Sequence, residues 1–328
     1  MVKERSLSKK TFIITGGNTG LGYECAKNIT KYDKNNQIVI ACRNATRAKE
    51  AVNSLIRETG NDNIISLELD LSSLQSVRNF VTQFLNSQLP LLYAIVCNAG
   101  IQLVDREQYT KDGFELTFGV NHLGHFLLVN MLLESISETG RIVFVSSGTH
   151  DPLQKTGMPE PKYESARLLA YPKGIGPKEN ISLIGRRKYT TSKLCNLYCV
   201  YELTERIKKQ TNKSITVNAF DPGLMPGTGL ARSYTPFLRF VSRYVLSLLI
   251  LVHPNVNTVT KSGKALASLV NNPDLAKTTG KYFEGIKEIK SSTLSYSKEN
   301  RKDLWRTSVK LSGLTKNETI LTLDTQEI

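Results

Sequence analysis

Short apolar runs alternate along this chain with segments in which apolar residues recur every three or four positions. The runs expected to form strands are Thr11–Thr15, Gln37–Cys42, Ile64–Leu69, Leu92–Cys97, Arg141–Ser146, Ser214–Phe220 and the shorter Gly280–Phe283. Because Val, Ile and Leu follow one another in most of them, these strands are expected to be covered on both faces of a sheet. Helical spacing is clear at 47–57 and 74–85, between successive runs. This order predicts an α/β fold with a doubly wound parallel sheet of about seven strands, flanked by helices.

One domain is expected to hold the whole chain, 1–328, because no repeat or low-complexity linker divides it. Two segments interrupt the alternation, 148–188 and 225–257, and both follow strands at the carboxyl edge of the sheet, where open α/β sheets bind ligands. We therefore expect them to be insertions that form the walls of a substrate site. A C-terminal extension is expected from about residue 291, with Trp305 as the anchor of a helix and a loosely attached end beyond Thr315.

The cysteines and the charge exclude several classes of protein. Five cysteines, an odd number without a regular spacing, indicate reduced core thiols in an intracellular protein rather than a disulfide scaffold. Cys195 and Cys199 lie one helical turn apart, but no second pair completes a metal site, so no metal is predicted. The net charge of +14 suits either an anionic ligand or surface or simply solvated basic faces, and we favour the second. No basic patch is interleaved with aromatics, so a nucleic-acid partner is not expected.

The longest apolar stretch bears on location. No apolar segment of a signal peptide follows the basic start, and the nine residues of Tyr244–Val252 are too few to span a bilayer, which takes about 20 residues. The segment 236–252 is compatible with an amphipathic helix that covers a pocket or contacts a membrane. The chain is therefore expected to be cytoplasmic or peripherally associated with a membrane.

A glycine-rich segment follows the first predicted strand and opens a helix. Glycine allows a tight turn and a close approach of phosphate to the backbone, and the helix start offers free N–H groups and a positive dipole end. This context predicts a Rossmann-type dinucleotide site. The residues predicted to bind the pyrophosphate are Gly16, Asn18, Thr19, Gly20, Leu21 and Gly22.

The end of the second strand indicates which dinucleotide binds. NAD enzymes place an acidic residue there to accept hydrogen bonds from the ribose hydroxyls. This chain instead has Arg43, with Arg47 one turn later. A guanidinium group pairs well with a phosphate, so NADP(H) is predicted rather than NAD(H).

Several motifs in order resemble the short-chain dehydrogenase/reductase family over about residues 10 to 285. They are TGxxxGxG at 15–22, Asn98-Ala99-Gly100 after the fourth strand, Ser146-Ser147 after the fifth, and YxxxK from Tyr189 to Lys193. Within the family, the residues at 114–116, 120–126 and 189–196 look most like protochlorophyllide reductases and retinol-dehydrogenase-like members. The resemblance implies a small, apolar substrate and leaves the oligomeric state open.

The resemblance implies a role for each catalytic candidate. Tyr189 would donate or accept the proton; a free phenol has a pKa of about 10, so it needs help near neutral pH. Lys193, four residues later on the same helical face, would stabilise the phenolate and bind the nicotinamide ribose. Ser147 would bind the substrate oxygen, for which Ser146 and Thr149 compete, and Asn121 would hold a water that links Lys193 to solvent. No chemistry is assigned to the histidines at 122 and 125.

Further cofactor contacts follow from the same resemblance. Those predicted are Asp70, Leu71, Asn98, Ala99, Gly100, Pro222, Gly223 and Thr228, besides Tyr189 and Lys193. Thr228 departs from the family's register, because the family's threonine follows the proline of this loop by five positions and here position 227 is Gly.

The function predicted from the sequence is an NADPH-dependent oxidoreductase that moves a hydride to or from a carbonyl, an alcohol or a conjugated double bond. Light-dependent reduction of a protochlorophyllide-like double bond is the alternative; the cysteine that this branch carries in its pocket is missing from 148–188. An inactive nucleotide-binding scaffold is the alternative of another class. Such scaffolds usually lose the tyrosine or the lysine, and this chain has both.

Overall fold

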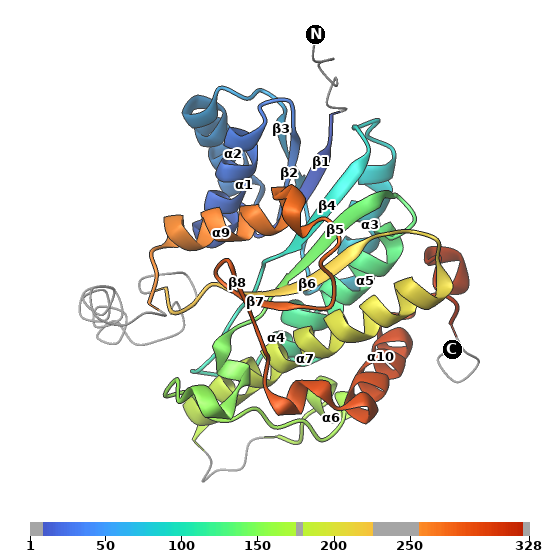
Figure 1. Cartoon of the computed structure of the whole chain (residues 1–328). Helices are drawn as coiled ribbons and strands as arrows, with labels where there is room; N and C mark the ends of the chain where they lie inside the picture. Colours follow the sequence, from blue (N-terminus) through green and yellow to red (C-terminus); the bar gives the residue numbers. More distant parts are fainter. Residues whose placement is uncertain (1–8, 175–179, 226–255, 324–328) are drawn as a thin grey trace.

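The computed structural model describes residues 9–174, 180–225 and 256–323. Its centre is one sheet with the strand order β3-β2-β1-β4-β5-β6-β7-β8 (Figure 1). The strands are β1 Thr11–Thr15, β2 Gln37–Cys42, β3 Ile64–Glu68, β4 Leu92–Cys97, β5 Ile136–Val145, β6 Thr216–Asp221, β7 Tyr282–Glu284 and β8 Lys287–Ile289. The order reverses direction between β1 and β4, as in a doubly wound fold. The predicted α/β architecture is therefore confirmed.

The predicted number of about seven strands is corrected to eight. β1 to β7 are parallel, and β8 adds an antiparallel edge strand through a hairpin from β7. Gly285, at φ +58°, makes the turn of this hairpin. β8 has only three residues, two of them charged, so it lacks the apolar run that marks a buried strand.

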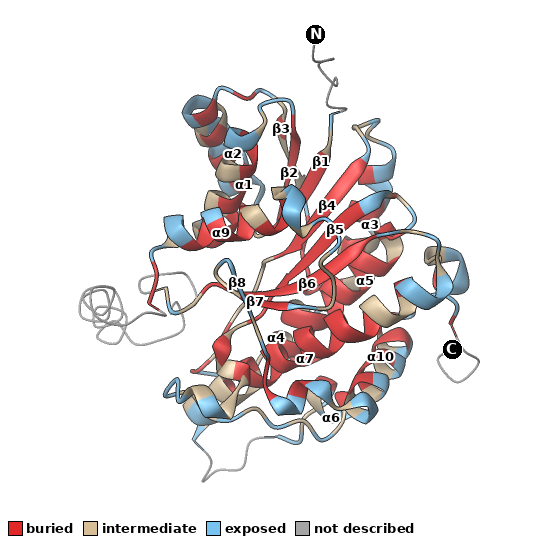
Figure 2. Cartoon of the chain, viewed as in Figure 1, coloured by how far each residue is buried: buried red, intermediate tan, exposed pale blue. Residues whose placement is uncertain are grey.

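Helices cover both faces of the sheet, as Figures 1 and 2 show. One face packs against α1 Gly20–Tyr32, α2 Ala45–Thr59 and α9 Val259–Asn271. The other packs against α3 Leu74–Leu85, α5 Gly124–Leu132, α7 Ile181–Gln210 and α10 Lys298–Ser312. Short helices complete the second layer: α4 Leu116–Phe118, a π-helical turn at Gly119–Leu123, and α6 Ala166–Ala170. β1, β2, β4 and β6 are buried along their whole length between these layers, whereas β3 and β8, at the two edges of the sheet, are mostly half-buried or exposed.

The first predicted insertion, 148–188, is shorter than expected. Two 3₁₀ turns, Gly148–His150 and Pro152–Gln154, follow β5, and α7 already begins at Ile181. The side chain of Asn180 caps this helix by accepting a hydrogen bond from the backbone N–H of Leu183. The first turns of α7 are only partly buried and carry several basic residues, so they lack the apolar spacing that signals a helix.

The C-terminal extension is an integral part of the second helical layer. α10 packs against α7, and Trp305, which is 2% exposed, makes an edge-to-face contact with Phe126 at 4.9 Å between ring centroids. The expectation of a loosely attached end beyond Thr315 is wrong for the residues described there, 316–323. Arg78 forms an ion pair of 2.9 Å with Glu318, and Leu321 and Leu323 are buried.

Two predictions fall outside the described residues. Of the second insertion, 225–257, only the two ends are described, and the segment 236–252 lies wholly outside. Thr228 lies outside as well. Among the helices that the structure does describe, none is both long and apolar enough to cross a membrane.

Candidate active site

The glycine-rich loop between β1 and α1 forms an open cradle at the carboxyl edge of the sheet. Gly16 and Gly20 have positive φ values of +64° and +56°, which favour glycine. A Cβ on Gly22 would lie 2.7 Å from the carbonyl oxygen of Gly16, so the loop folds tightly against the helix. A Cβ on Gly20 would meet nothing within 4 Å, and Thr19 makes no side-chain cap. The first N–H groups of α1 are thus left for a ligand, as a pyrophosphate requires.

The other residues predicted for this loop contribute in different ways. The side chains of Asn18 and Thr19 are half-buried and exposed, at the open side of the loop. Leu21 is buried in the core, so only its backbone remains for a phosphate. The residues present therefore fit a dinucleotide, whose pyrophosphate their main-chain N–H groups can bind.

The fourth strand holds this loop in place through Asn98. The backbone N–H groups of Asn98 and Ala99 each donate to Oγ1 of Thr15 at 2.9 Å. Nδ2 of Asn98 donates to the backbone oxygen of Thr15 at 2.7 Å. A Cβ on Gly100 would lie 3.4 Å from Oδ1 of Asn121 and 3.7 Å from Nζ of Lys193. The three residues of this motif thus connect the phosphate loop to the catalytic candidates.

Arg43 and Asp70 follow the second and third strands at the same edge. Arg43 is exposed and has no hydrogen-bond or ionic partner within the described ranges. The carboxylate of Asp70 accepts hydrogen bonds from Ser72 at 2.6 Å and 3.1 Å and pairs with Lys111 at 3.1 Å. Burial acts to raise the pKa of Asp70, but these partners outweigh it and hold the pKa below its usual value. Leu71 is buried against Gly124 of α5.

Tyr189 and Lys193 are buried on the same face of α7, with exposed fractions of 7% and 3%. Nζ of Lys193 lies 5.4 Å from the ring centroid of Tyr189 and donates a hydrogen bond of 3.0 Å to the backbone oxygen of Val145. Burial lowers the pKa of Lys193 to about 8, and the negative charge of Asp221 opposes this effect. An ammonium group beside a phenol is an arrangement suited to proton transfer.

The two serines after β5 have different environments. Oγ of Ser146 is buried and donates to the backbone oxygen of Lys193 at 2.9 Å, so it serves the packing of α7 on the sheet. Ser147 is half-buried and accepts a hydrogen bond from the backbone N–H of Thr149 at 3.3 Å. Its own hydroxyl proton remains available, as contact with a substrate oxygen requires. Ser147 is therefore the better candidate of the two.

Asn121 lies in the π-helical turn, a feature that often marks functional sites. Its Oδ1 accepts from the backbone N–H of Ile101 at 2.8 Å, and its Nδ2 donates to the backbone oxygen of Ile101 and to Oγ of Ser192. The side chain thus ties the loop after β4 to α7. One lone pair of Oδ1 is left for the water that the sequence predicts.

The sequence did not indicate the hydrogen bonds or the pKa values of the two buried histidines. His125 bridges the site, with Nε2 at 2.8 Å from Oγ1 of Thr15 and Nδ1 at 3.2 Å from the backbone oxygen of Asn121. Nε2 of His122 lies 2.8 Å from Oγ of Ser308 on α10. Burial lowers the pKa of His122 to about 3 and that of His125 to about 4, so both are neutral near pH 7. Their role is to join elements.

Asp221 and His150 lie at the edge of the site, and the sequence analysis gave neither residue a role of its own. Asp221 is 1% exposed, and its carboxylate accepts hydrogen bonds from Gly148, Gly223 and Tyr282. Nδ1 of His150 lies 2.6 Å from the backbone oxygen of Ser147, and its Nε2 accepts from the N–H of Ser292 at 3.0 Å. The available signal was an acid at the end of an apolar strand, where a charge needs partners.

Pro222, one of the predicted cofactor contacts, is held in place through its backbone oxygen. Its backbone oxygen accepts from Oγ of Ser262 at 2.7 Å and from Nδ2 of Asn257 at 3.2 Å. Gly223 has φ +73°. The loop after β6 is therefore fixed to α9 on one side and to Asp221 on the other.

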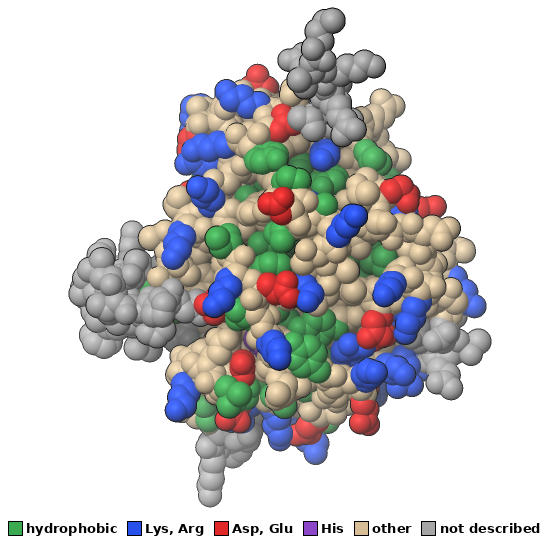
Figure 3. Space-filling view, in the orientation of Figure 1, with side chains coloured by type: hydrophobic (Ala, Val, Ile, Leu, Met, Phe, Trp, Pro, Cys, Tyr) green, Lys and Arg blue, Asp and Glu red, His purple; other side chains and the backbone are tan. Residues whose placement is uncertain are grey.

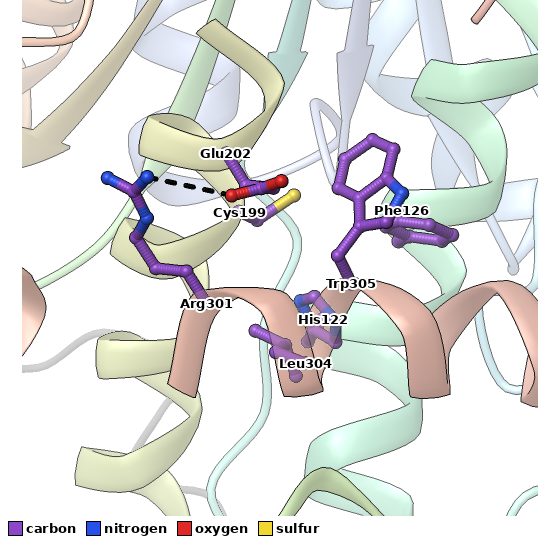
Figure 4. A pocket seen from close by; sticks show the side chains of 7 residues that line it. All are labelled: His122, Phe126, Cys199, Glu202, Arg301, Leu304 and Trp305. Atoms are coloured by element: carbon purple, nitrogen blue, oxygen red, sulfur yellow. Dashed lines mark ion pairs between the residues drawn. The ribbon is translucent and has the colours of Figure 1, made fainter. Parts of the chain in front are cut away.

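A separate pocket lies among the helices, away from the carboxyl edge of the sheet (Figure 4). It lies between α5, α7 and α10, with about 150 Å³ of empty space including open solvent. Its lining residues are His122, Phe126, Cys199, Glu202, Arg301, Leu304 and Trp305. None of the predicted site residues lines it, and its Glu202–Arg301 ion pair of 3.6 Å joins two helices. We read it as a packing seam.

On the face shown in Figure 3, basic side chains are spread among acidic and apolar ones rather than gathered in one patch. This distribution agrees with solvated basic faces on that side of the molecule.

Comparisons with known proteins show the family to which the chain is related. A family model described as short chain dehydrogenase matches residues 10–158. The chain is 32% identical to a chloroplastic protochlorophyllide reductase of Daucus carota over 95% of this chain and 80% of that protein. It is 30% identical to a polyprenol dehydrogenase of Homo sapiens over 92% of this chain and 84% of that protein. The crystal structure of an uncharacterized protein from Mycobacterium paratuberculosis shares the fold, with a TM-score of 0.67 at 23% identity over 97% of each chain.

Proposed function

The chain belongs to the short-chain dehydrogenase/reductase family, in the branch of the protochlorophyllide reductases and polyprenol dehydrogenase, and we propose that it is an NADPH-dependent oxidoreductase acting on a carbonyl/alcohol pair or a conjugated double bond. The observation that carries the proposal is the burial of Tyr189 and Lys193 one helical turn apart at the carboxyl edge of the sheet. A buried tyrosine and lysine without this chemistry would be costly to maintain.

The cofactor proposal rests on the cradle and on Arg43. When bound, NADPH would supply the hydride. The free N–H groups at the start of α1 would hold its pyrophosphate, and Arg43 would hold the phosphate of its adenosine ribose. Asp70 and Leu71 would lie toward the adenine, and Asn98, Ala99 and Gly100 toward the middle of the dinucleotide.

The protein's own residues would handle the proton. Tyr189 would give a proton to the substrate during reduction and take one during oxidation. Lys193, as a cation, would stabilise the phenolate form of Tyr189 and bind the nicotinamide ribose. Ser147 would donate a hydrogen bond to the substrate oxygen, and Asn121 would hold the loop after β4 and a water near Lys193.

The substrate is proposed to be small and apolar, like the pigment and the polyprenol in the names of the relatives. Carbonyl/alcohol chemistry is favoured over pigment reduction, because 148–188 contains no cysteine. The chain is proposed to act in the cell, in the cytoplasm or at a membrane surface that 236–252 would contact. We favour an active enzyme over a scaffold, since both Tyr189 and Lys193 are present.

The test is a titration of the folded chain with NADPH and NADH, followed by a screen of apolar aldehydes, ketones and conjugated pigments. We expect tight NADPH binding and NADPH oxidation with at least one substrate. Tyr189→Phe should keep the binding and lose on the order of 10²- to 10⁴-fold in kcat. If the folded protein binds neither nucleotide, the proposal fails. If it binds NADPH but oxidises it with no substrate, the inactive nucleotide-binding scaffold replaces the enzyme.

A further inference from the structure

The carboxylate of Asp221 joins two segments that are distant in sequence. Its Oδ2 accepts a hydrogen bond of 2.9 Å from the backbone N–H of Gly148, in the turn after β5. Its Oδ1 accepts one of 2.9 Å from the backbone N–H of Gly223, in the loop after β6. Gly148 follows Ser147 directly, and Gly223 belongs to the loop predicted to contact the cofactor. One buried side chain therefore contacts both walls of the site.

From this geometry we propose that Asp221 is a positioning residue, which sets the substrate-binding turn at Ser147 and the cofactor loop at Pro222–Gly223 in one fixed relation. The catalytic consequence of this proposal rests on the proposed function. The positioning of the two segments by Asp221 can be tested without a substrate. Asp221 itself would touch neither the substrate nor the reacting atoms.

The carboxylate of Asp221 is closely surrounded, and its hydrogen-bond partners are all donors. Tyr282 of β7 donates its hydroxyl to Oδ2 at 3.2 Å, so Gly148, Gly223 and Tyr282 all act as donors to this carboxylate. A Cβ built on Gly148 would lie 3.0 Å from Oδ2 and closer still to Oε1 of Gln154, so a side chain there would force these neighbours to shift. Three donors are satisfied by a carboxylate and not by an amide, because an amide nitrogen would turn a donor toward a donor.

The turn after β5 has a second support that strengthens the case. Nδ1 of His150 lies 2.6 Å from the backbone oxygen of Ser147, and its ring packs edge-to-face on Tyr282 at 5.0 Å. Asp221 and His150 thus hold the same peptide group, between Ser147 and Gly148, Asp221 through its N–H and His150 through its C=O. Asp221 is hydrogen-bonded to Tyr282 of β7 and His150 packs on its ring, so β7 supports this turn.

Asp221 also acts on the charge of Lys193. The titratable groups that surround its carboxylate are Lys193 on α7, His150 after β5, and Tyr282 and Glu284 on β7. Burial lowers the pKa of Lys193 to about 8, and Asp221 works against that effect. Removing the negative charge should therefore lower the pKa of Lys193 further and shift the alkaline loss of activity to lower pH.

The first measurement uses no substrate. Amide hydrogen exchange is followed at Gly148 and Gly223 in the wild type and in Asp221→Asn. We expect exchange to quicken by about tenfold or more at both glycines in the variant. The matched control is Asp151→Asn. The carboxylate of Asp151 also follows β5 but accepts a hydrogen bond from the backbone N–H of Leu153, so its loss should leave the exchange rates of both glycines unchanged. Unchanged exchange at Gly148 and Gly223 in folded Asp221→Asn would overturn the proposal, whatever the outcome for the proposed function.

The second measurement separates position from charge. With the substrate found in the screen, Asp221→Asn should lower kcat by about 10- to 100-fold and move the alkaline limb of kcat/KM to lower pH. Asp221→Glu keeps the charge but displaces the carboxylate, so it should lower kcat and leave that limb in place. If Asp221→Asn does not fold, Asp221→Glu still decides: kcat equal to the wild type would overturn the positioning role.

Discussion

The ammonium group of Lys193 donates a hydrogen bond of 3.0 Å to the backbone oxygen of Val145, the last residue of β5. The same oxygen accepts from Nδ2 of Asn196, one turn further along α7. α7 is thereby fixed to the end of β5, where Ser146 and Ser147 follow. This contact places the lysine and the tyrosine of one helix next to the serine turn of a strand.

The activity should fall as pH rises through about 8. Burial lowers the pKa of Lys193 to about 8, so its cationic form, which stabilises the phenolate of Tyr189, is lost above that pH. The measurement is kcat/KM from pH 6 to 10, with Lys193→Met expected to lose on the order of 10²- to 10⁴-fold at pH 7. Lys208→Met, an exposed lysine at the far end of α7, is the control and should keep the wild-type profile. A profile that stays flat to pH 10 would contradict the role given to Lys193.

The sequence predicts the fold well because the decisive signals are local. Five of the first six strands lie within two residues of the predicted apolar runs, β5 begins five residues before its predicted start, and the glycine loop after β1 is where the spacing puts it. β8 was missed because Lys287–Ile289 has no apolar run, and the start of α7 was missed because its first turns are half-exposed. Local patterns fail where an element is held by its neighbours rather than by its own composition.

The candidate site likewise has one part that local sequence patterns predict and another that they do not. The types and spacing of Tyr189, Lys193 and Ser147 mark them in the sequence, and the carboxyl edge brings them together. The contact between Gly148 and Asp221 joins residues 73 positions apart, and that between His150 and Ser292 joins residues 142 apart. Such contacts depend on the register of β5, β6 and β7 and leave no periodic trace in a single sequence.

Trp305 should be essential for the stability of the whole domain. It is 2% exposed, packs on Phe126 and lies under the guanidinium of Arg206 at 4.4 Å from the ring centroid. Trp305→Ala should lower the free energy of unfolding by about 3–5 kcal/mol, measured by urea denaturation. Trp305→Phe should cost clearly less, since the indole N–H has no hydrogen-bond partner in the described part of the chain. A loss under about 1 kcal/mol for Trp305→Ala would show that α10 is not part of the core.

Acid should destabilise the fold below about pH 6.5 through His122 and His125. Their pKa values lie near 3 and 4 in the folded state, below the value of 6.5 for a free histidine. The unfolded chain therefore binds more protons between these values, and stability is full above pH 6.5 and lost as pH falls. At pH 5 each histidine should cost about 2 kcal/mol relative to pH 7.

The measurement is the free energy of unfolding at pH 7 and pH 5 for the wild type and His122→Gln. The variant loses the contact with Ser308, so it should be less stable at pH 7, but its loss between the two pH values should be smaller by about 2 kcal/mol. Burial raises the pKa of Asp221 and of Glu115, which changes stability in the opposite sense and equally in both proteins. Identical losses in the two proteins would refute the assignment to His122.

Arg43 should decide between the two dinucleotides. It follows β2 at the carboxyl edge, is exposed, and has no partner within the described ranges, so its guanidinium can pair with a phosphate without first breaking another contact. A charge-assisted hydrogen bond contributes about 1.5–3 kcal/mol, so Arg43→Ala should weaken NADPH binding roughly 10- to 100-fold. NADH lacks that phosphate, and its affinity should change little. Arg57→Ala removes an exposed arginine at the far end of α2 and should leave both affinities unchanged. Equal weakening of NADPH and NADH in Arg43→Ala would mean that Arg43 contacts a part common to both, and the preference for NADPH would then need another residue.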